Sequence, residues 1–200
     1  MSRTKQYDRN DLLDRSIELF RRKGFNGTST ADLVSELGVN RKSMYAEFGS
    51  KQSLFEAALE RYEDKYLSRV LAVIEKPNAG IEDILKAFYG YAKASEGQYR
   101  GLGCLMCNTA VERAALDPAS GEYVAAYLNR FTAAFRHALE NGLESGDIQD
   151  SVNVDSMAQF LTTAMVGISA SIRAEAPPEQ IWATYEVVDT IFKSQQSLGK

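Results

Sequence analysis

Basic and hydroxyl side chains gather between residues 28 and 51, where they could bind phosphate groups and the edges of bases. Arg41 and Lys42 can reach the acceptor atoms of guanine, and Ser43 is short enough for a base edge or a phosphate. Thr28 and Ser29 lie where a helix is expected to begin, and hydroxyls and free amides at such an end suit a phosphate. The segment therefore predicts recognition of a nucleic acid.

Two short helices are predicted to carry these side chains. The first begins at Ser29, where the sequence STAD has the form of a capping box, and it ends at Gly38. The second is capped by Asn40 and runs to about Phe48 before Gly49 ends it. Two short helices joined in this way are typical of a helix-turn-helix, whose second helix enters the major groove of DNA.

Apolar residues on both sides predict the helices that hold this pair. Before it, a helix with one apolar face is closed by Gly24, and after it Ser50 caps a longer helix that reaches Ile74. Met44 and Phe48 share the apolar face of the second short helix, so we expect them in the core rather than on DNA.

These elements together resemble a known family. The sequences LLDRSIELFRRKGFNGTST and LGVNRKSMYAEFGSKQSLFEAAL are similar to the N-terminal domain of TetR/AcrR transcriptional regulators, over about the first sixty residues. From Ile74 onward the chain resembles the family's helical ligand-binding and dimerisation domain, by architecture more than by sequence. The resemblance implies a DNA-binding domain over residues 1–50 and a ligand-binding and dimerisation domain over residues 51–200.

The resemblance also extends the set of DNA contacts. Tyr45 matches a tyrosine that family members place on the DNA backbone, and Lys51 matches a position used for a phosphate. The expected set is Thr28, Ser29, Asn40, Arg41, Lys42, Ser43, Tyr45 and Lys51. Lys42 replaces a residue that is often small and could instead be only a solvated charge. Glu47 would repel phosphate, or accept a hydrogen bond from a cytosine amino group.

Composition and charge agree with a nucleic-acid partner for one part of the chain. The protein has 200 residues, of which 44% are hydrophobic and 25% charged, with a net charge of −4. Residues 1–51 hold ten Lys and Arg against seven Asp and Glu, a net charge of +3, so the remainder is acidic. An acidic body with a basic module limits non-specific DNA binding while one face still attracts phosphate.

Several classes of protein are excluded by what the sequence lacks. No apolar run approaches the roughly 18 residues of a membrane helix, and the N-terminus lacks the apolar core of a signal peptide. With two cysteines, this favours a cytoplasmic protein without a membrane partner. There is one histidine and no spacing typical of a metal site, a cofactor loop or a catalytic triad, so neither an enzyme nor a metal protein is expected.

The fold class predicted from hydrophobic periodicity is all-α, with about nine helices. If the C-terminal part is a sensor, an effector would bind among its central helices. Aromatic and thioether side chains suited to an apolar or aromatic molecule are Phe88, Tyr91, Tyr99, Met106, Tyr123, Tyr127, Phe131 and Phe135. For each of them, packing in the core is the alternative role.

Cys104 and Cys107 form a CxxC pair at the expected start of a helix. A helix N-terminus favours the thiolate, which would allow the pair to sense an oxidant or an electrophile. Buried structural cysteines are the alternative, because a thiol inside a protein behaves mostly as a small hydrophobe.

The last two helices are predicted to form a homodimer interface. Their apolar residues cover more than one face, and small residues allow close approach. The residues expected there are Phe160, Ala164, Gly167, Ile168, Ser171, Trp182, Tyr185, Val188 and Phe192. The alternative is that these surfaces pack only within their own domain.

The resemblance implies a ligand-responsive regulator. We expect a dimer that binds a palindromic double-stranded DNA operator as a repressor and is released by a small apolar or aromatic effector. An activator is an alternative, because the sign of regulation depends on where the operator lies. A sensor that acts through Cys104 and Cys107 is another.

Overall fold

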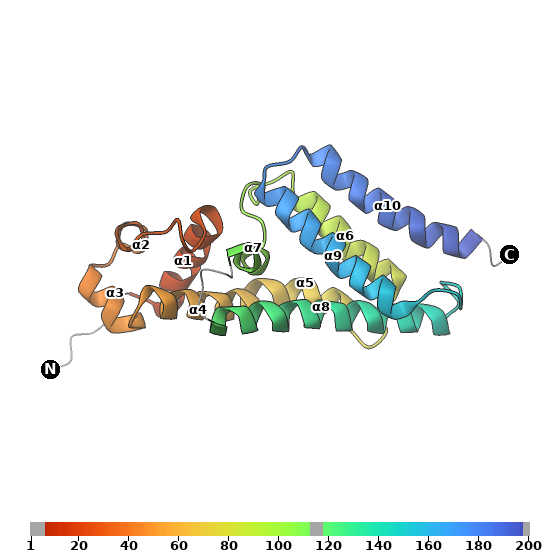
Figure 1. Cartoon of the computed structure of the whole chain (residues 1–200), viewed down its shortest axis with the longest axis horizontal. Helices are drawn as coiled ribbons and strands as arrows, with labels where there is room; N and C mark the ends of the chain where they lie inside the picture. The colour runs from red at the N-terminus through yellow and green to blue at the C-terminus, as the bar shows by residue number, and fades with distance from the viewer. Residues whose placement is uncertain (1–6, 113–117, 198–200) are drawn as a thin grey trace. The chain divides into compact units, whose positions relative to one another are not determined.

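The computed structural model describes residues 7–112 and 118–197, and all regular structure within these ranges is helical (Figure 1). The helices are α1 (Arg9–Lys23), α2 (Thr30–Leu37), α3 (Arg41–Phe48), α4 (Lys51–Tyr62), α5 (Ser68–Ile74), α6 (Ile81–Ala94), α7 (Leu105–Glu112), α8 (Pro118–Glu144), α9 (Val154–Arg173) and α10 (Pro178–Ser197). A π-helical turn, η1 (Glu63–Leu67), joins α4 to α5 without a break. With these three counted as one, the described residues hold nine helices, and the predicted all-α fold is confirmed.

Short polar side chains set the starts of several helices. Asp8, Ser29, Asn40, Ser50 and Asn153 each accept a hydrogen bond from a backbone amide in the first turn of the following helix. These bonds satisfy donors that would otherwise have no partner within the helix. The three caps predicted around the helix-turn-helix are therefore confirmed.

The π turn lies in the fourth helix, which is α4, η1 and α5 taken together. The sequence predicted one regular helix to Ile74 and did not indicate this turn. Tyr62 and Leu67 are both buried, at 5% and 2% exposure, and are five residues apart. A regular helix repeats every 3.6 residues, so buried positions usually recur after three or four. The interval of five indicates one inserted residue, which the wider π turn accommodates.

The chain packs into two compact units that do not follow its order. The first is Met1–Lys65 with Leu105–Val124, and the second is Tyr66–Cys104 with Ala125–Lys200. The helices α4 and α7 thus pack with the N-terminal helices. The division of function at residue 50 stays a prediction, because packing does not test it.

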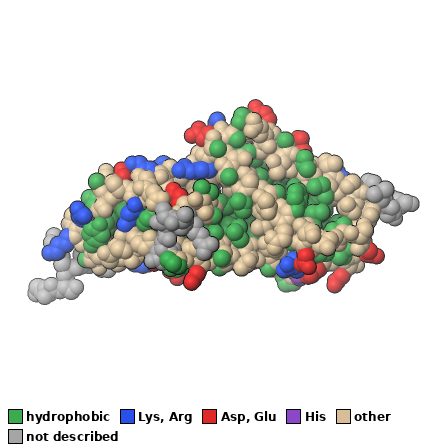
Figure 2. Space-filling view, in the orientation of Figure 1, with side chains coloured by type: hydrophobic (Ala, Val, Ile, Leu, Met, Phe, Trp, Pro, Cys, Tyr) green, Lys and Arg blue, Asp and Glu red, His purple; other side chains and the backbone are tan. Residues whose placement is uncertain are grey.

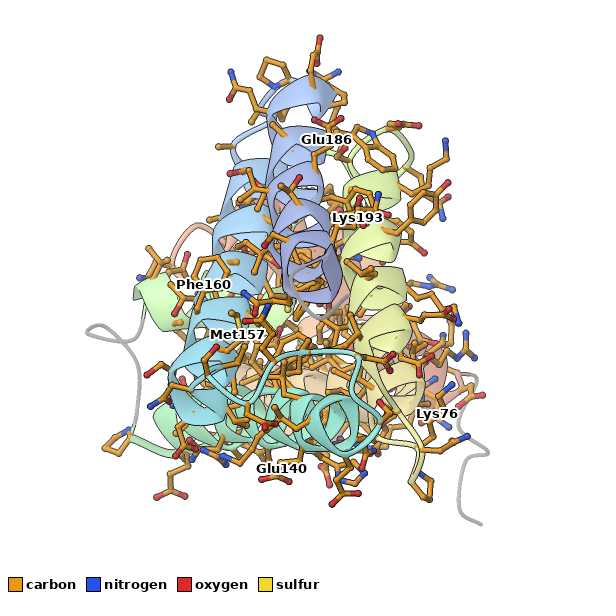
Figure 3. The ribbon with its side chains drawn as sticks, turned by 90° about the vertical axis from the view of Figure 1, so that its right-hand side faces the viewer. Lys76, Glu140, Met157, Phe160, Glu186 and Lys193 are labelled. Atoms are coloured by element: carbon orange, nitrogen blue, oxygen red, sulfur yellow. The ribbon has the colours of Figure 1, made fainter. Side chains whose placement is uncertain are left out.

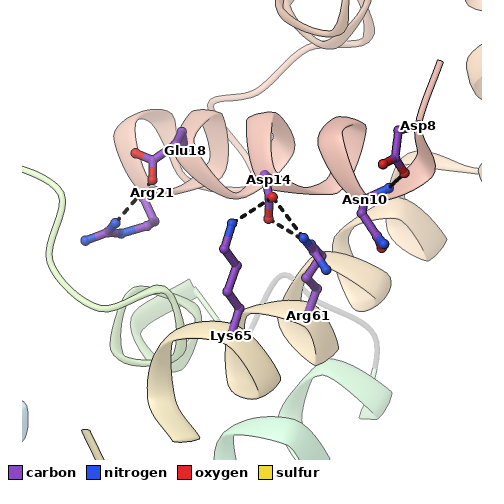
Figure 4. A network of polar contacts seen from close by, with 7 residues as sticks. All are labelled: Asp8, Asn10, Asp14, Glu18, Arg21, Arg61 and Lys65. Carbon is purple, nitrogen blue, oxygen red and sulfur yellow. Dashed lines mark hydrogen bonds and ion pairs between the residues drawn. The ribbon is translucent and has the colours of Figure 1, made fainter. Parts of the chain in front are cut away.

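The first unit is built around a cluster of aromatic rings and one polar network. Phe20 and Phe55 are fully buried and meet edge to face, with ring centroids 4.8 Å apart. Figure 4 shows how α1 is tied to the fourth helix: both carboxylate oxygens of Asp14 accept from Arg61, at 2.7 and 2.9 Å, and one also accepts from Lys65 at 2.8 Å. The Arg61 and Lys65 hydrogen bonds lower the pKa of Asp14 despite its partial burial.

In the second unit α6 packs on α5, α9 and α10, and α8 adds a further row of buried side chains. The single histidine, His137, is on α8, and its ring contacts the turn before α6. Its ring nitrogen Nε2 lies 3.0 Å from the carbonyl oxygen of Pro77, and Asn141 donates to the carbonyls of Pro77 and Ala79. His137 therefore helps to hold that turn against α8. Among the described residues, no helix is long and apolar enough to cross a membrane.

Candidate nucleic-acid interface

The start of α2 is closed by Ser29 and Asp32. The amide of Asp32 donates to the Ser29 hydroxyl at 3.1 Å, and the amide of Ser29 donates to the Asp32 carboxylate at 2.9 Å. Lys23 donates to the same carboxylate at 2.5 Å, and this bond, with those from Ser29, holds the pKa of Asp32 well below its usual range. The predicted capping box is confirmed, and it leaves Ser29 exposed beside the free amides of the helix end.

Thr28 does not belong to this exposed end. Its side chain is fully buried, and its hydroxyl donates to the carbonyl of Gly24 at 2.6 Å. The hydroxyl thus closes the turn between α1 and α2 and is not accessible to a phosphate. We therefore remove Thr28 from the predicted contact set.

The connection from α2 to α3 has the geometry of a tight turn. Gly38 has φ 65° and ψ 23°, a left-handed conformation that costs glycine little because it lacks a Cβ atom. Asn40 then accepts from the amide of Ser43 at 2.8 Å and starts α3. The cap uses the Oδ1 atom of Asn40, and the NH2 group of this exposed residue is left as a donor.

The short helix α3 has two faces of opposite character. Met44 and Phe48 are buried, at 1% and 8% exposure, which confirms their predicted place in the core. Arg41 and Lys42 are exposed, and Ser43 is half-buried. The core therefore fixes one face of α3, while the opposite face carries its cations and short polar groups into solvent.

Tyr45 is held in place by two neighbours. Its hydroxyl lies 3.2 Å from the hydroxyl of Thr30 at the start of α2, and the Arg41 guanidinium lies 5.5 Å from the centre of its ring. The hydrogen bond with Thr30, and then the one with Arg41, lower the pKa of the Tyr45 phenol. The side chain is thus oriented before any partner binds, which reduces the entropy lost on binding.

Lys51 begins α4 and lies against an aromatic ring. Its Nζ atom is 4.2 Å from the centroid of Phe25, a favourable cation–π distance. Partial burial lowers the pKa of the Lys51 ammonium, while Glu112 and Asp32 act in the opposite direction. The cation therefore has a fixed position at the edge of the helix-turn-helix.

Glu47 does not present its charge where the sequence analysis expected it. The carboxylate accepts from the Tyr7 hydroxyl at 3.2 Å and pairs with Arg9 at 3.6 Å, and its side chain is only 6% exposed. Arg9 also lies 5.4 Å from the centre of the Phe48 ring. The expected repulsion of phosphate, or contact with cytosine, is therefore wrong for Glu47 in this position.

The basic residues at the end of α1, Arg21 to Lys23, mostly contact other side chains of the protein. Arg21 is 4% exposed and lies over the Tyr62 ring, Arg22 pairs with Glu36 at 3.0 Å, and Lys23 pairs with Asp32. Figure 2 shows Lys and Arg side chains gathered over the part of the surface formed by α1, α2 and α3. This leaves the exposed cations of α3, together with Lys51, as the groups predicted to contact a nucleic acid directly.

Two family models match this arrangement. The model of bacterial regulatory proteins of the tetR family matches residues 12–58, which include α2 and α3, and that of the tetracyclin repressor-like C-terminal domain matches residues 77–187. The chain belongs to the TetR family. It is a DNA-binding transcriptional regulator and not an enzyme, which confirms the family and the broad function expected from the sequence.

Curated relatives of this TetR-family chain are similar over most of their length. The HTH-type transcriptional repressor ComR of Escherichia coli K12 is 31% identical over 189 residues, which span 90% of this chain and 86% of ComR. The uncharacterized HTH-type transcriptional regulator YezE of Bacillus subtilis 168 is 28% identical over 182 residues, or 90% of this chain and 94% of YezE.

Solved structures of TetR-family regulators share the fold. A cysteine mutant of the TetR-family regulator CifR, solved with 26-bp operator DNA, superposes with a TM-score of 0.78 at 23% identity, covering 93% of this chain and 97% of CifR. A regulator from Agrobacterium tumefaciens gives 0.80 at 18% identity, with coverage of 93% and 96%.

The second unit of this TetR-family chain contains half of the predicted effector residues as one buried series. Tyr127, Phe131 and Phe135 lie on α8, and Phe88 on α6 meets Phe135 with ring centroids 6.0 Å apart. All four are at most 2% exposed.

The other four predicted effector residues are distributed differently. Tyr91 is half-buried, and Tyr99 is 37% exposed. Met106 and Tyr123 belong to the first unit. The structure therefore brings together four of the eight residues, Phe88, Tyr127, Phe131 and Phe135.

Both cysteines are buried thiols. The Cys104 Sγ atom lies 3.6 Å from the Tyr127 hydroxyl, which connects it to the aromatic series of α8. Within the described ranges, no group of three or more His, Cys, Asp and Glu side chains is arranged to hold a metal ion.

The residues predicted for the dimer interface differ in their exposure, and those of α9 include the exposed ones. Phe160 and Gly167 are exposed, and Ala164 and Ser171 are half-buried on α9. Figure 3 shows Phe160 on the side of α9 turned away from α6. These positions form a surface that a second copy could cover.

The remaining dimer residues are used inside the chain. Trp182 packs 5.2 Å from Tyr89 of α6 and donates to Glu96 at 2.6 Å, and Tyr185 lies 5.9 Å from Tyr89. The most deeply buried members of the set are Ile168, Val188 and Phe192, at 1–2% exposure. These three belong to the core of the second unit, so their assignment to the interface is corrected. Val187 of α10 is 55% exposed and was not among the predicted interface residues.

Two residues that position the predicted DNA contacts were not identified from the sequence. Thr30 orients Tyr45, and Phe25 lies under Lys51. Both contacts depend on how separate helices meet, and periodicity along one helix carries no such signal. The one sequence feature that could have indicated the role of Phe25 is its position as an aromatic residue directly after the helix-ending Gly24.

Proposed function

We propose that this TetR-family chain is a repressor that binds a palindromic operator as a homodimer and leaves it when a small apolar or aromatic effector binds. The observation that carries the proposal is the two-faced α3 helix. Its apolar face is fixed in the core by Met44 and Phe48, so Arg41, Lys42 and Tyr45 have a defined outward position. Recognition helices of this kind read base edges from the major groove.

The contact set in this proposal is smaller than the one expected from sequence. Arg41 and Lys42 would contact bases, and Ser29, Asn40, Ser43, Tyr45 and Lys51 would contact phosphates or base edges. Residues 1–50 would carry DNA recognition, and residues 51–200 the effector site and the dimer interface. The acidic body supports a cytoplasmic protein that avoids non-specific DNA.

A dimer follows from the geometry of this kind of recognition. Two recognition helices must meet successive major grooves, about 34 Å apart along the duplex, which one copy cannot do. The exposed Phe160 and Val187 on α9 and α10 support an interface between copies, because large apolar side chains are costly to leave in water. The names of the repressor relatives support negative regulation.

Release by an effector requires that it prefer the conformer that does not fit the operator. The buried series Phe88, Tyr127, Phe131 and Phe135 supports an effector with an apolar or aromatic body. A coupling free energy of about 1–3 kcal/mol would weaken operator binding roughly 5–150-fold.

Fluorescence anisotropy tests the proposal with two duplexes: DNA from upstream of the chain's own gene and a scrambled sequence of the same composition. At a fixed salt concentration near physiological, the expected preference for the native duplex is about a thousandfold or more. Equal weak binding to both duplexes would contradict specific recognition at this site.

Tyr45 provides a second test of the same interface. Tyr45→Ala should weaken binding to the native duplex by more than about tenfold, because it removes a charge-assisted contact and a pre-oriented ring. Tyr91→Ala, at a half-buried position of the second unit, serves as the control for removal of a tyrosine ring. Sedimentation of both variants would verify that the dimer is intact.

Sensing of an oxidant at Cys104 and Cys107 is a second candidate function. The contact between the Cys104 thiol and the Tyr127 hydroxyl favours it, because a change at that sulfur would reach the aromatic series directly. Peroxide oxidises a thiol to a sulfenic acid and is itself reduced to water. If the pair is functional, peroxide should weaken DNA binding of the wild type and leave a Cys104→Ser, Cys107→Ser variant unaffected.

A further inference from the structure

Glu112 of α7 lies against the turn that follows α1. The amide of Phe25 donates to its Oε2 atom at 2.8 Å. A Cβ atom on Gly24 would collide with the other carboxylate oxygen, and Gly24 itself has a φ of 74°. The close approach of the carboxylate thus depends on a glycine at this position.

The carboxylate of Glu112 has partners outside α7. The amide of Phe25 donates a charge-assisted hydrogen bond to it, and the Lys51 ammonium adds an attractive charge. These contacts fix the backbone of Phe25 relative to α7.

Phe25 connects this carboxylate to the DNA interface. Its ring packs 4.9 Å from Phe55 and 6.3 Å from Phe20, and its outer side carries the Nζ atom of Lys51 at 4.2 Å. The backbone of Phe25 is thus held by Glu112, and its ring supports Lys51. All of these residues belong to the first compact unit.

We propose that Glu112 is a positioning residue for the phosphate contact of Lys51, acting through the backbone and ring of Phe25. This inference rests on the proposed function, because it takes Lys51 as a DNA contact. Displacement of α7 would withdraw the acceptor from Phe25 and loosen the support under Lys51. Since α7 also carries Cys107, a change at that thiol has a direct structural route to the DNA contacts.

The direction of the change in DNA affinity distinguishes a positioning role of Glu112 from a purely electrostatic one. Removing a negative charge close to DNA strengthens binding if electrostatics alone operates. Glu112→Ala, which also removes the acceptor, should instead weaken binding to the native upstream duplex about tenfold, the usual size for the removal of one charge-assisted hydrogen bond. Glu112→Gln keeps an acceptor oxygen and should bind as tightly as the wild type or more tightly.

Hydrogen exchange gives a readout that does not depend on DNA. The Phe25 amide should exchange about tenfold faster in Glu112→Ala and at nearly the wild-type rate in Glu112→Gln. Glu122→Ala, at an exposed position of α8 in the same unit, is the matched control and should change neither exchange nor affinity. Phe25→Leu tests the second link: it keeps the amide, removes the ring under Lys51 and should also weaken binding.

Distinct outcomes would overturn the proposed function and the positioning role of Glu112. A wild type with no preference for the native duplex overturns the proposed function and the role of Lys51 with it. A wild type that binds specifically, with Glu112→Ala binding equally well or more tightly, overturns the positioning role alone. Unchanged exchange of the Phe25 amide in a folded Glu112→Ala protein overturns the role as well.

Discussion

At the scale of the residue, Lys51 shows how a surface cation acquires a fixed position. The Phe25 ring beneath it and partial burial restrict a side chain that would otherwise lose rotamer freedom on binding. A phosphate that meets such a cation gains attraction at a lower entropic cost.

Replacing Lys51 should therefore change the salt dependence of DNA binding. Lys51→Ala should reduce the slope of log K against log salt concentration by about 0.9 for each phosphate that the protein no longer neutralises. Anisotropy titrations at several salt concentrations measure this slope. Lys86→Ala, at an exposed cation on α6, is the control, and an equal change in both variants would count against a specific phosphate contact at Lys51.

Ser169 on α9, in contrast to Lys51, has a polar side-chain atom that no neighbouring group in the described part of the chain stabilises. Among the buried side chains that the structure describes, its hydroxyl has no hydrogen-bond partner, whereas Thr162 donates to the carbonyl of Ala158. Ser169→Ala should raise the free energy of unfolding by about 1 kcal/mol, because it removes an unsatisfied group. Thr162→Val should lower it by a similar amount, and urea unfolding compares the two. A destabilised Ser169→Ala protein would contradict the assignment.

At the scale of the element, the sequence was informative where structure is local. The caps of Ser29 and Asn40 and the left-handed Gly38 depend only on residues a few positions apart, and all three were predicted. Thr28 was placed wrongly, because its burial depends on how α1 and α2 pack. Glu47 was placed wrongly for the same reason, since its partners Tyr7 and Arg9 lie far away in the chain.

The network of Asp14, Arg61 and Lys65 should stabilise the pairing of α1 with the fourth helix. Asp14→Asn should lower the free energy of unfolding by about 1–3 kcal/mol at pH 7, since it removes the negative charge and one of the two acceptor oxygens that bind the partly buried Arg61 and Lys65. Asp11→Asn removes only an exposed pair with Arg15 and should cost less than about 0.5 kcal/mol.

The pH dependence of this network has a defined sign. Because the folded state lowers the pKa of Asp14, its contribution is fully present above the ordinary value of 3.8 and is lost as the pH falls through the folded pKa. The difference between wild type and Asp14→Asn should thus shrink towards low pH. Urea unfolding at pH 7, 5 and 3 measures it, and a difference that grows with acidity would contradict the network.

At the scale of the whole molecule, dimerisation and DNA binding should fail together. Phe160→Glu places a charge on the exposed apolar face of α9 and should weaken the dimer about thirtyfold or more. Operator affinity should fall with it, because one copy reaches only one half-site. Sedimentation equilibrium measures the first effect, and Ala72→Glu, at an exposed position of α5, is the control. A dimer that tolerates Phe160→Glu would place the interface elsewhere.

The C-terminal part of the chain was harder to predict than the helix-turn-helix. Periodicity identified its helices but not which residues of a stripe face inward. Phe160 and Ile168 lie two turns apart on α9, yet one is 43% exposed and the other 2%. Similarly, Met106 and Tyr123 were grouped with the effector residues by type alone and belong to another compact unit. Only the packing of neighbouring helices separates such cases.

The π turn at Glu63–Leu67 has a consequence for the evolution of this chain. One residue inserted into a regular helix would shift the phase of all later positions by about 100°, but the π turn absorbs the extra residue. Deleting a single residue there would therefore restore a regular helix and leave the Leu71 and Ile74 side chains facing the core that they now fill. We expect this segment to tolerate the gain or loss of one residue without a change in the apolar pattern that follows.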